Sequence, residues 1–233
     1  MHEKNELKKI PCYNSLYFKD KERIANLPSN DRILLRGYRS YIGANDPERW
    51  YGIGRLQYYF LINQGLKHNS IFLDLGCGAL RLGQYLIPYL ETRHYFGLEP
   101  EKLLVDCGIF YELDKNILNE KKPNFQFNYA FEFPELKSFD YCMANSIFTH
   151  LNKEDIKICF EKLILKTNPN SKFFFTFKLG DSKKNKYEKS HANRSWEYKF
   201  EEIIPLALGW DLKFIGDWNH PNNQQMVLAS PKK

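Results

Sequence analysis

Segments typical of strands alternate with segments typical of helices from Ser70 onward, and this alternation constrains the fold more than any other feature. The strand-like segments are short and apolar, whereas the helix-like segments carry apolar residues at spacings of three and four. Such alternation is typical of an α/β protein built on a mostly parallel sheet. The sequence therefore predicts an α/β core over residues 70–233, preceded by an extension over residues 1–69 with a helix that packs on the core.

Seven strands are predicted, at residues 71–75, 95–98, 125–133, 139–144, 173–177, 211–217 and 225–229. Phenylalanine or tyrosine occupies every second position from Phe125 to Phe133, as an exposed-and-buried strand requires. The apolar run from Phe173 to Phe177 suits a central strand buried on both faces. Turn-forming residues separate the last two strands, which predicts a hairpin at the C-terminal end.

Helical periodicity predicts five helices, around residues 48–66, 80–87, 101–117, 153–164 and 200–208. Pro88 is expected to limit the second helix, because proline lacks the backbone N–H that a helix interior needs. Asn152 precedes the fourth helix and is a predicted N-cap. Gly209 follows the fifth helix, where a glycine commonly ends the last turn.

Length and composition exclude several classes of protein. The 233 residues suffice for one sizeable core. No apolar run approaches the ~20 residues of a membrane span, and the polar start lacks a signal peptide's apolar region, so a cytoplasmic protein without a membrane span is expected. The cysteines are odd in number and form no C-x-x-C pair, so neither a disulfide framework nor a metal site is predicted.

The formal charge of +6 gathers in two stretches, residues 4–23 and 183–194. One interpretation is a solvated basic face, and the other is that the second stretch holds an anionic acceptor. The chain has no continuous basic helix, zinc-finger spacing or aromatic RNA-binding signature, which counts against nucleic acid as a partner. No feature predicts an oligomeric state.

A glycine-containing turn follows the first strand in the sequence LDLGCGALRLG, from Leu73 to Gly83. Gly76 and Gly78 lack a Cβ, so the chain can turn sharply there and a ligand can approach the backbone. This segment resembles the first motif of class I S-adenosylmethionine-dependent methyltransferases. The resemblance implies a Rossmann-like seven-stranded sheet, mostly parallel with a C-terminal antiparallel hairpin. Leu80 departs from the commonest form of the motif, which has a third glycine.

The same resemblance implies S-adenosylmethionine as the cofactor. It implies that Asp74 positions the amino-acid end of the cofactor, that Glu99 accepts the ribose hydroxyls, and that residues 130–132 lie beside the adenine. The residues assigned to the cofactor are Asp74, Gly76, Cys77, Gly78, Arg81, Glu99, Phe131, Asn145 and Ser146.

Each of these assignments has a competitor. A nicotinamide dinucleotide also uses a glycine turn, but Arg81 occupies the place of its last glycine and Asp74 would face a pyrophosphate. Glu99 is otherwise a surface acid before a helix, and Phe131 otherwise belongs to the core. Asn145 and Ser146 otherwise satisfy backbone groups in a turn.

The segments GLEP, SIFTHL and WNHP extend the resemblance to bacterial methyltransferases that act on glycans and other small metabolites. That resemblance implies O-methylation of a sugar, a sugar nucleotide or a related phosphorylated precursor of cell-envelope glycan. His150 and His220 are the candidate general bases, and structural roles for both remain open. Two alternatives also stay open: an RNA or protein methyltransferase, and an S-adenosylmethionine-binding accessory protein without turnover.

Overall fold

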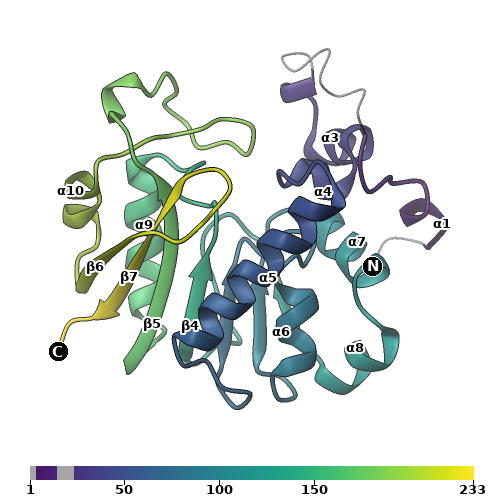
Figure 1. Ribbon diagram of the computed structural model, residues 1–233, viewed down its shortest axis with the longest axis horizontal. Coiled ribbons are helices and arrows are strands. Elements are labelled where there is room, and N and C mark those ends of the chain that lie inside the picture. Colours follow the sequence, from purple (N-terminus) through teal and green to yellow (C-terminus); the bar gives the residue numbers. More distant parts are fainter. Residues whose placement is uncertain (1–3, 15–23) are drawn as a thin grey trace. The chain divides into compact units, whose positions relative to one another are not determined.

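The computed structural model of the protein describes residues 4–14 and 24–233 (Figure 1). The chain forms two compact units. The first comprises residues 1–68, 77–95 and 99–127, and the second comprises residues 69–76, 96–98 and 128–233. Part of the N-terminal basic stretch, residues 15–23, lies outside the described residues. The boundary at residue 70 between an extension and a core stays a prediction.

The strands pair in the order β3-β2-β1-β4-β5-β7-β6 in one seven-stranded sheet. They are β1 (Phe72–Leu75), β2 (Tyr95–Leu98), β3 (Asn124–Gln126), β4 (Phe139–Ala144), β5 (Thr167–Lys178), β6 (Trp210–Asp217) and β7 (Gln224–Pro231). Strand β4 pairs in parallel with β1 and β5, whereas β7 pairs antiparallel with β5 and β6. The predicted α/β fold, mostly parallel with an antiparallel C-terminal hairpin, is confirmed.

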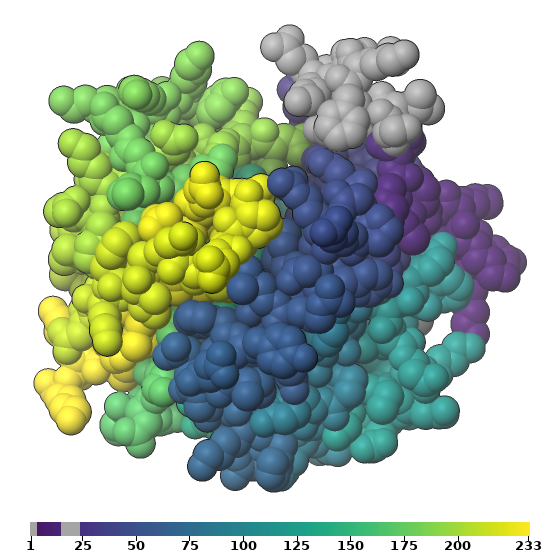
Figure 2. Space-filling model, in the orientation of Figure 1, coloured from purple at the N-terminus to yellow at the C-terminus, as the bar shows by residue number. Residues whose placement is uncertain are grey.

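Strand β5 is central in the second unit, as its apolar run predicts. It lies between β4 and β7, and its phenylalanines from Phe173 to Phe175 are fully buried. Helix α9 (Lys153–Ile164) covers it, with the ring of Phe160 5.8 Å from that of Phe173. The hairpin of β6 and β7 continues the sheet beyond β5, and yellow atoms of this C-terminal segment are visible on the face drawn in Figure 2.

The connection from β5 to β6 contains only short helical turns: η2 (Ser182–Lys184), α10 (Phe200–Ile203) and η3 (Ile204–Leu206). The prediction of one helix over residues 200–208 is therefore wrong in its extent. Pro205 has no N–H to bond to the carbonyl of Glu201, so the α-helix cannot continue through it. Gly209 ends the segment with a φ of 82°.

The first unit is mainly helical, and Figure 1 shows its helices from purple to teal. They are α1 (Lys4–Leu7), α3 (Ser29–Arg36), α4 (Tyr38–Tyr41), α5 (Pro47–Asn63), α6 (Gly83–Tyr89), α7 (Lys102–Tyr111) and α8 (Lys115–Lys121). Helix α5 packs on α6, because Gly54 leaves room for the ring of Tyr85. Helices α1 and α3 both contact α7.

Two predicted helices have different bounds in this unit. The helix expected over residues 101–117 is split into α7 and α8, because Asp114 caps α8 by accepting the N–H of Asn116 at 2.7 Å. The helix expected from Leu80 begins only at Gly83, since Leu80 has a positive φ. Pro88 lies inside the last turn of α6 rather than beyond it.

Strand β3 is much shorter than its alternating pattern predicts. Asn128 ends it, because the side-chain Oδ1 accepts the N–H groups of both Ala130 and Glu132 at 3.0 Å. Phe131 then takes a left-handed φ of 53°. These local bonds replace the ladder that an extended strand would need. Among the described residues, no helix is both long and apolar enough to cross a bilayer.

Candidate functional site

Asp74 and Gly76 lie where β1 ends in the second unit. Asp74 is buried, and Gly76 has a φ of 73° while its N–H donates to the carbonyl of Leu98 at 2.8 Å. A Cβ at Gly76 would lie 2.0 Å from Cδ1 of Ile147. Both the backbone conformation and the close approach therefore favour glycine here.

Ser146 occupies a strained turn directly after β4, with a φ of 62°. Its N–H donates to Oγ1 of Thr176 at 2.7 Å, and that hydroxyl donates to Oε1 of Gln224 at 2.6 Å. The Nε2 of Gln224 lies 2.9 Å from Oγ of Ser146 and completes the network. Sequence reasoning missed Thr176 and Gln224, although Thr176 is the one polar residue inside the apolar run of β5. Residues from β5 and β7 thus hold Ser146 in place.

Asn145, the residue before Ser146, carries a buried amide. Asn145 is only 8% exposed, and neither its Oδ1 nor its Nδ2 has a hydrogen-bond partner among the described residues. Leaving a buried amide unpaired is unfavourable, so such groups generally have a partner. The position therefore suits a bound polar ligand better than a structural amide.

The ring of His150 is oriented by a backbone carbonyl. Its Nδ1 lies 2.6 Å from the carbonyl oxygen of Arg194, and the N–H of His191 donates to the His150 carbonyl at 3.1 Å. A carbonyl only accepts hydrogen bonds, so we infer that Nδ1 carries the proton of the neutral ring. The Nε2 atom then has the lone pair that a general base needs.

His220 has the opposite arrangement. It is buried, its ring is stacked on Trp218 at a centroid distance of 5.3 Å, and Nδ1 accepts the N–H of Asn222 at 3.3 Å. The proton of the neutral ring is then on Nε2, which makes that atom a donor. Of the two predicted histidines, His150 has the geometry that better suits proton removal.

The basic stretch of residues 183–194 belongs to the second unit and is tied to the start of α9. The N–H of Asn152 donates to Oγ of Ser190 at 2.8 Å, and Nδ2 of Asn152 donates to the carbonyl of Glu188 at 2.7 Å. The hydroxyl of Ser190 also donates to Asp155. These bonds place the stretch beside the segment that carries His150.

The family resemblance predicts that Phe131 lies beside the adenine. Its side chain is half-buried and packs against the apolar core of the second unit. This packing favours the structural interpretation of the residue, and its contact with a cofactor stays a prediction.

Glu99 follows β2 in the first unit and is 9% exposed. Its Oε2 accepts the N–H of Gly78 at 3.0 Å, and its Oε1 accepts the N–H of Glu101 at 3.1 Å. Its own N–H donates to the carbonyl of Gln126 at 3.0 Å. The carboxylate thus holds the second glycine of the turn.

The remaining residues assigned to the cofactor also lie in the first unit. Gly78 has a φ of 53° and lies against Ile42, whose Cδ1 would be 3.1 Å from an added Cβ. Cys77 and Arg81 are buried, and Nη1 of Arg81 lies 3.5 Å from the carbonyl of Ile42, which accepts from it. Their contact with a ligand stays a prediction.

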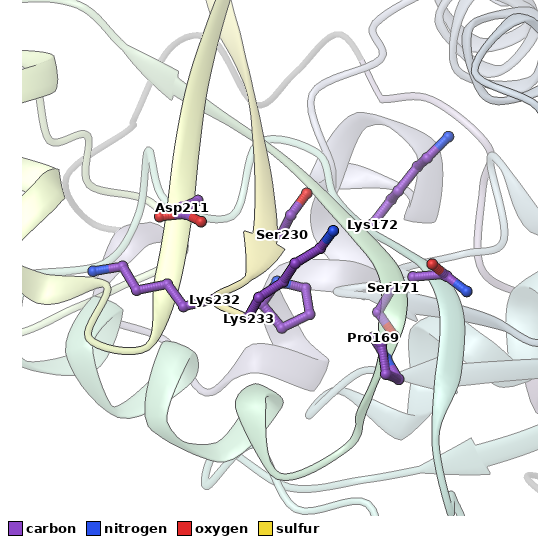
Figure 3. Close-up of a pocket in the computed structure, with 9 residues that line it drawn as sticks. Pro169, Ser171, Lys172, Asp211, Ser230, Lys232 and Lys233 are labelled. Atoms are coloured by element: carbon purple, nitrogen blue, oxygen red, sulfur yellow. The ribbon is translucent and has the colours of Figure 1, made fainter.

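A pocket of about 570 Å³ lies in the second unit, at the amino-terminal end of β5 (Figure 3). It is lined by the first residues of β5 and by the end of β7, including Lys172, Ser230 and Lys232. The predicted site residues follow the carboxyl ends of β1 and β4, so this pocket is not their site. The described residues contain no cluster of three or more groups that could hold a metal ion.

No protein-family model and no curated protein sequence matches the chain. Solved structures do match it. The PH0226 protein from Pyrococcus horikoshii OT3 is 16% identical, covers 89% of this chain and 100% of its own, and gives a TM-score of 0.61. Magnesium protoporphyrin IX methyltransferase from Synechocystis PCC 6803, with bound S-adenosylmethionine, is 13% identical over 94% of this chain and 93% of its own, with a TM-score of 0.60.

A glycopeptide N-methyltransferase, MtfA, complexed with S-adenosyl-L-homocysteine, is 13% identical over 78% of this chain and 90% of its own, with a TM-score of 0.58. The chain therefore has the fold of S-adenosylmethionine-dependent methyltransferases, and the predicted fold family is confirmed.

Proposed function

We propose that the protein is an S-adenosylmethionine-dependent methyltransferase that methylates a hydroxyl group of a small polar acceptor. The proposed acceptor is a sugar, a sugar nucleotide or a related phosphorylated precursor of bacterial cell-envelope glycan. The fold supports the reaction class, because neighbours of this fold include methyltransferases crystallised with the methyl donor or its demethylated product. The motif LDLGCGALRLG supports the same cofactor independently of the fold.

Glu99 is the observation that carries the cofactor proposal. It is a buried carboxylate at the end of a strand, and it accepts the N–H groups of Gly78 and Glu101. A carboxylate has about four lone-pair positions, so it can also accept the two hydroxyls of a ribose. When bound, S-adenosylmethionine supplies an electrophilic methyl group on a sulfonium.

In the second unit, Asp74 and Asn145 are the proposed ligands of the cofactor's amino-acid end. A carboxylate suits an ammonium, and the buried amide of Asn145 offers both a donor and an acceptor without a described partner. Gly76 and Ser146 shape the backbone beside these two side chains. Cys77, Gly78 and Arg81 retain the cofactor role that the motif gives them.

His150 is the proposed general base. Its Nε2 accepts the proton of the acceptor hydroxyl, while the hydrogen bond from Nδ1 to Arg194 keeps the ring in the required tautomer. His220, the other predicted base, carries its proton on Nε2, so its proposed role is instead to donate a hydrogen bond to the acceptor.

The basic stretch of residues 183–194 supports an anionic acceptor. Its backbone is anchored beside His150 by the bonds of Asn152 and Ser190, and its side chains Lys183, Lys184 and Lys186 are exposed. A phosphate on the acceptor would find several cations here. This arrangement supports a phosphorylated precursor over a neutral sugar.

Calorimetric titration with S-adenosylhomocysteine tests the cofactor proposal. The Glu99→Ala variant is expected to bind about 10- to 150-fold more weakly, because it loses charge-assisted hydrogen bonds. Glu120→Ala, which removes an exposed acid of the same unit, is the matched control and should bind normally. Equal affinities of a folded Glu99→Ala variant and the parent protein would reject the ribose role.

Incubation with isotopically labelled donor and fractionated metabolites, followed by mass identification of the product, tests the acceptor. A methylated, phosphorylated sugar is the expected product. Label in RNA or in protein would favour an RNA or a protein methyltransferase, respectively. An RNA methyltransferase should also bind generic RNA with a strong dependence on salt. Tight donor binding with no product from any extract would favour an accessory protein.

A further inference from the structure

Arg32 and Tyr41, on α3 and α4 of the first unit, form a buried polar cluster that the proposed roles above do not use. Arg32 is 6% exposed and Tyr41 is 8% exposed. The guanidinium carbon of Arg32 lies 5.5 Å from the centre of the Tyr41 ring, and that of Arg36 lies 5.6 Å from it. Two cations therefore lie close to one tyrosine.

Three hydrogen-bonding atoms of this cluster have no partner among the described residues: Nε and Nη1 of Arg32, and the hydroxyl of Tyr41. No ion pair of Arg32 is present within the same described part of the chain. A buried guanidinium without a counter-charge is costly, and contact with one aromatic ring returns only part of that cost. The unpaired donors therefore favour a bound anion at this position.

Two acids, Glu101 and Glu99, lie near enough to raise the pKa of Tyr41 through their negative charge. The carboxylate of Glu99 accepts the N–H groups of Gly78 and Glu101. Burial is the main cause that raises the pKa of Tyr41 to about 12, against the opposing effect of Arg32. The phenol thus keeps its proton at neutral pH and can donate it in a hydrogen bond.

We propose that Arg32 and Tyr41 form a binding subsite for an oxyanion, either a carboxylate or a phosphate. A guanidinium donates through a planar fork that fits the oxygens of both groups, and a phenol adds a third donor. The oxyanion belongs either to the amino-acid end of the cofactor or to the acceptor. Assigning it to the cofactor rests on the proposed function, whereas the subsite itself does not.

Inorganic phosphate is the first probe. Phosphate is expected to raise the thermal unfolding temperature of the parent protein saturably, beyond the effect of sodium chloride at equal ionic strength. The Arg32→Met variant should lose this response. Arg49→Met is the matched control, because Arg49 is a half-exposed arginine of the same unit with no side-chain bond among the described residues, and it should keep the response.

Two nucleosides then identify the source of the anion. S-adenosylhomocysteine carries a carboxylate, whereas 5′-methylthioadenosine lacks the whole amino-acid end. If the carboxylate is the ligand, Arg32→Met binds S-adenosylhomocysteine about 10- to 150-fold more weakly and 5′-methylthioadenosine normally. If the acceptor supplies the anion, both nucleosides bind Arg32→Met normally, while its phosphate response is still lost.

The proposal is overturned if Arg32→Met matches the parent protein in its phosphate response and in both affinities, or if it weakens both nucleosides equally. Should Arg32→Met fail to fold, Tyr41→Phe removes only one hydroxyl and should weaken the bound anion about threefold to tenfold. An unchanged affinity in Tyr41→Phe would then overturn it. A parent protein that binds neither nucleoside rejects the proposed function, yet the phosphate response still decides the subsite.

Discussion

Leu80 has a left-handed backbone, with a φ of 62°, at the position where the motif commonly has a third glycine. Its side chain is fully buried in the first unit. A Cβ in this conformation costs about 1–2 kcal/mol per residue, so the packing of the leucine must compensate for the strain. The departure from the motif therefore has a structural explanation that does not involve a ligand.

We predict that Leu80→Ala destabilises the protein more than Leu80→Gly, although glycine is smaller. Both variants lose a buried side chain, at a cost of about 2–5 kcal/mol, but only alanine keeps the backbone strain. The expected difference between them is about 1 kcal/mol, measurable by urea unfolding. A glycine variant less stable than the alanine variant would show that strain at this position is negligible.

His150 has a carbonyl partner for Nδ1, which prepares Nε2 to accept a proton. His150→Ala is predicted to lower kcat by about 10²- to 10⁴-fold while leaving donor affinity unchanged. The parent rate should fall as pH decreases, because the protonated ring cannot act as a base, and the variant should lose this dependence. Steady-state kinetics with the identified acceptor provide the measurement.

His68→Ala is the matched control, since His68 is exposed and Glu91 is its partner among the described residues. A His150→Ala variant with a near-normal kcat would remove the general-base role and leave positioning as the source of the rate.

Several short elements of the second unit meet at Glu202 of α10. Its carboxylate accepts hydrogen bonds from Lys153 of α9 at 2.8 Å, from the Lys199 N–H at 2.9 Å and from Ser182 of η2. Burial alone would raise the pKa of Glu202, but these bonds outweigh it and lower the pKa to about 2. The charged carboxylate therefore links three elements that have little helical stability of their own.

Glu202→Gln is predicted to reduce the free energy of unfolding by about 1–2 kcal/mol at pH 7, after allowance for partial exposure. Because the folded pKa is depressed, the contribution is complete above about pH 4.5 and is lost as the pH falls toward 2. The difference between variant and parent should shrink over that window in urea unfolding. Glu201→Gln, with no described side-chain bond, should differ little from the parent at any pH.

Most periodic elements of this chain and one helix cap could be predicted from the sequence, whereas other local side-chain bonds could not. Strands β2 and β4 have the predicted bounds, and Asn152 caps α9 as expected. The alternation from Phe125 to Phe133 is misleading, because the side chain of Asn128 bonds to the backbone and ends the strand. Periodicity carries no information about such competing bonds.

The candidate site shows the same division. The glycine turn and Glu99 have motif signals, whereas Thr176 and Gln224 act only through a network formed by the folded strands. Arg32 and Tyr41 come from an extension with no recognisable motif, so only burial without partners reveals them.

At the scale of the whole molecule, the fold allows many chemistries, and the ligand must be established by binding. Methyltransferases and dinucleotide enzymes both use a glycine turn after the first strand of a parallel sheet. The fold neighbours include methyltransferases crystallised with S-adenosylmethionine or S-adenosyl-L-homocysteine. The net charge of +6 is modest and does not itself identify a partner.

We predict that S-adenosylhomocysteine at 100 times its dissociation constant raises the unfolding temperature by about 5–10 °C. A ligand at that concentration stabilises the folded state by about 2.7 kcal/mol, and each kcal/mol corresponds to about 2–4 °C in a protein of this size. Differential scanning calorimetry measures the shift. Glu99→Ala should show less than about half of this temperature shift at the same concentration, because its binding is weaker.

NAD⁺ at equal concentration is expected to give no shift, since Asp74 and Arg81 replace features that a pyrophosphate requires. An equal response to NAD⁺ would contradict the methyl-donor assignment.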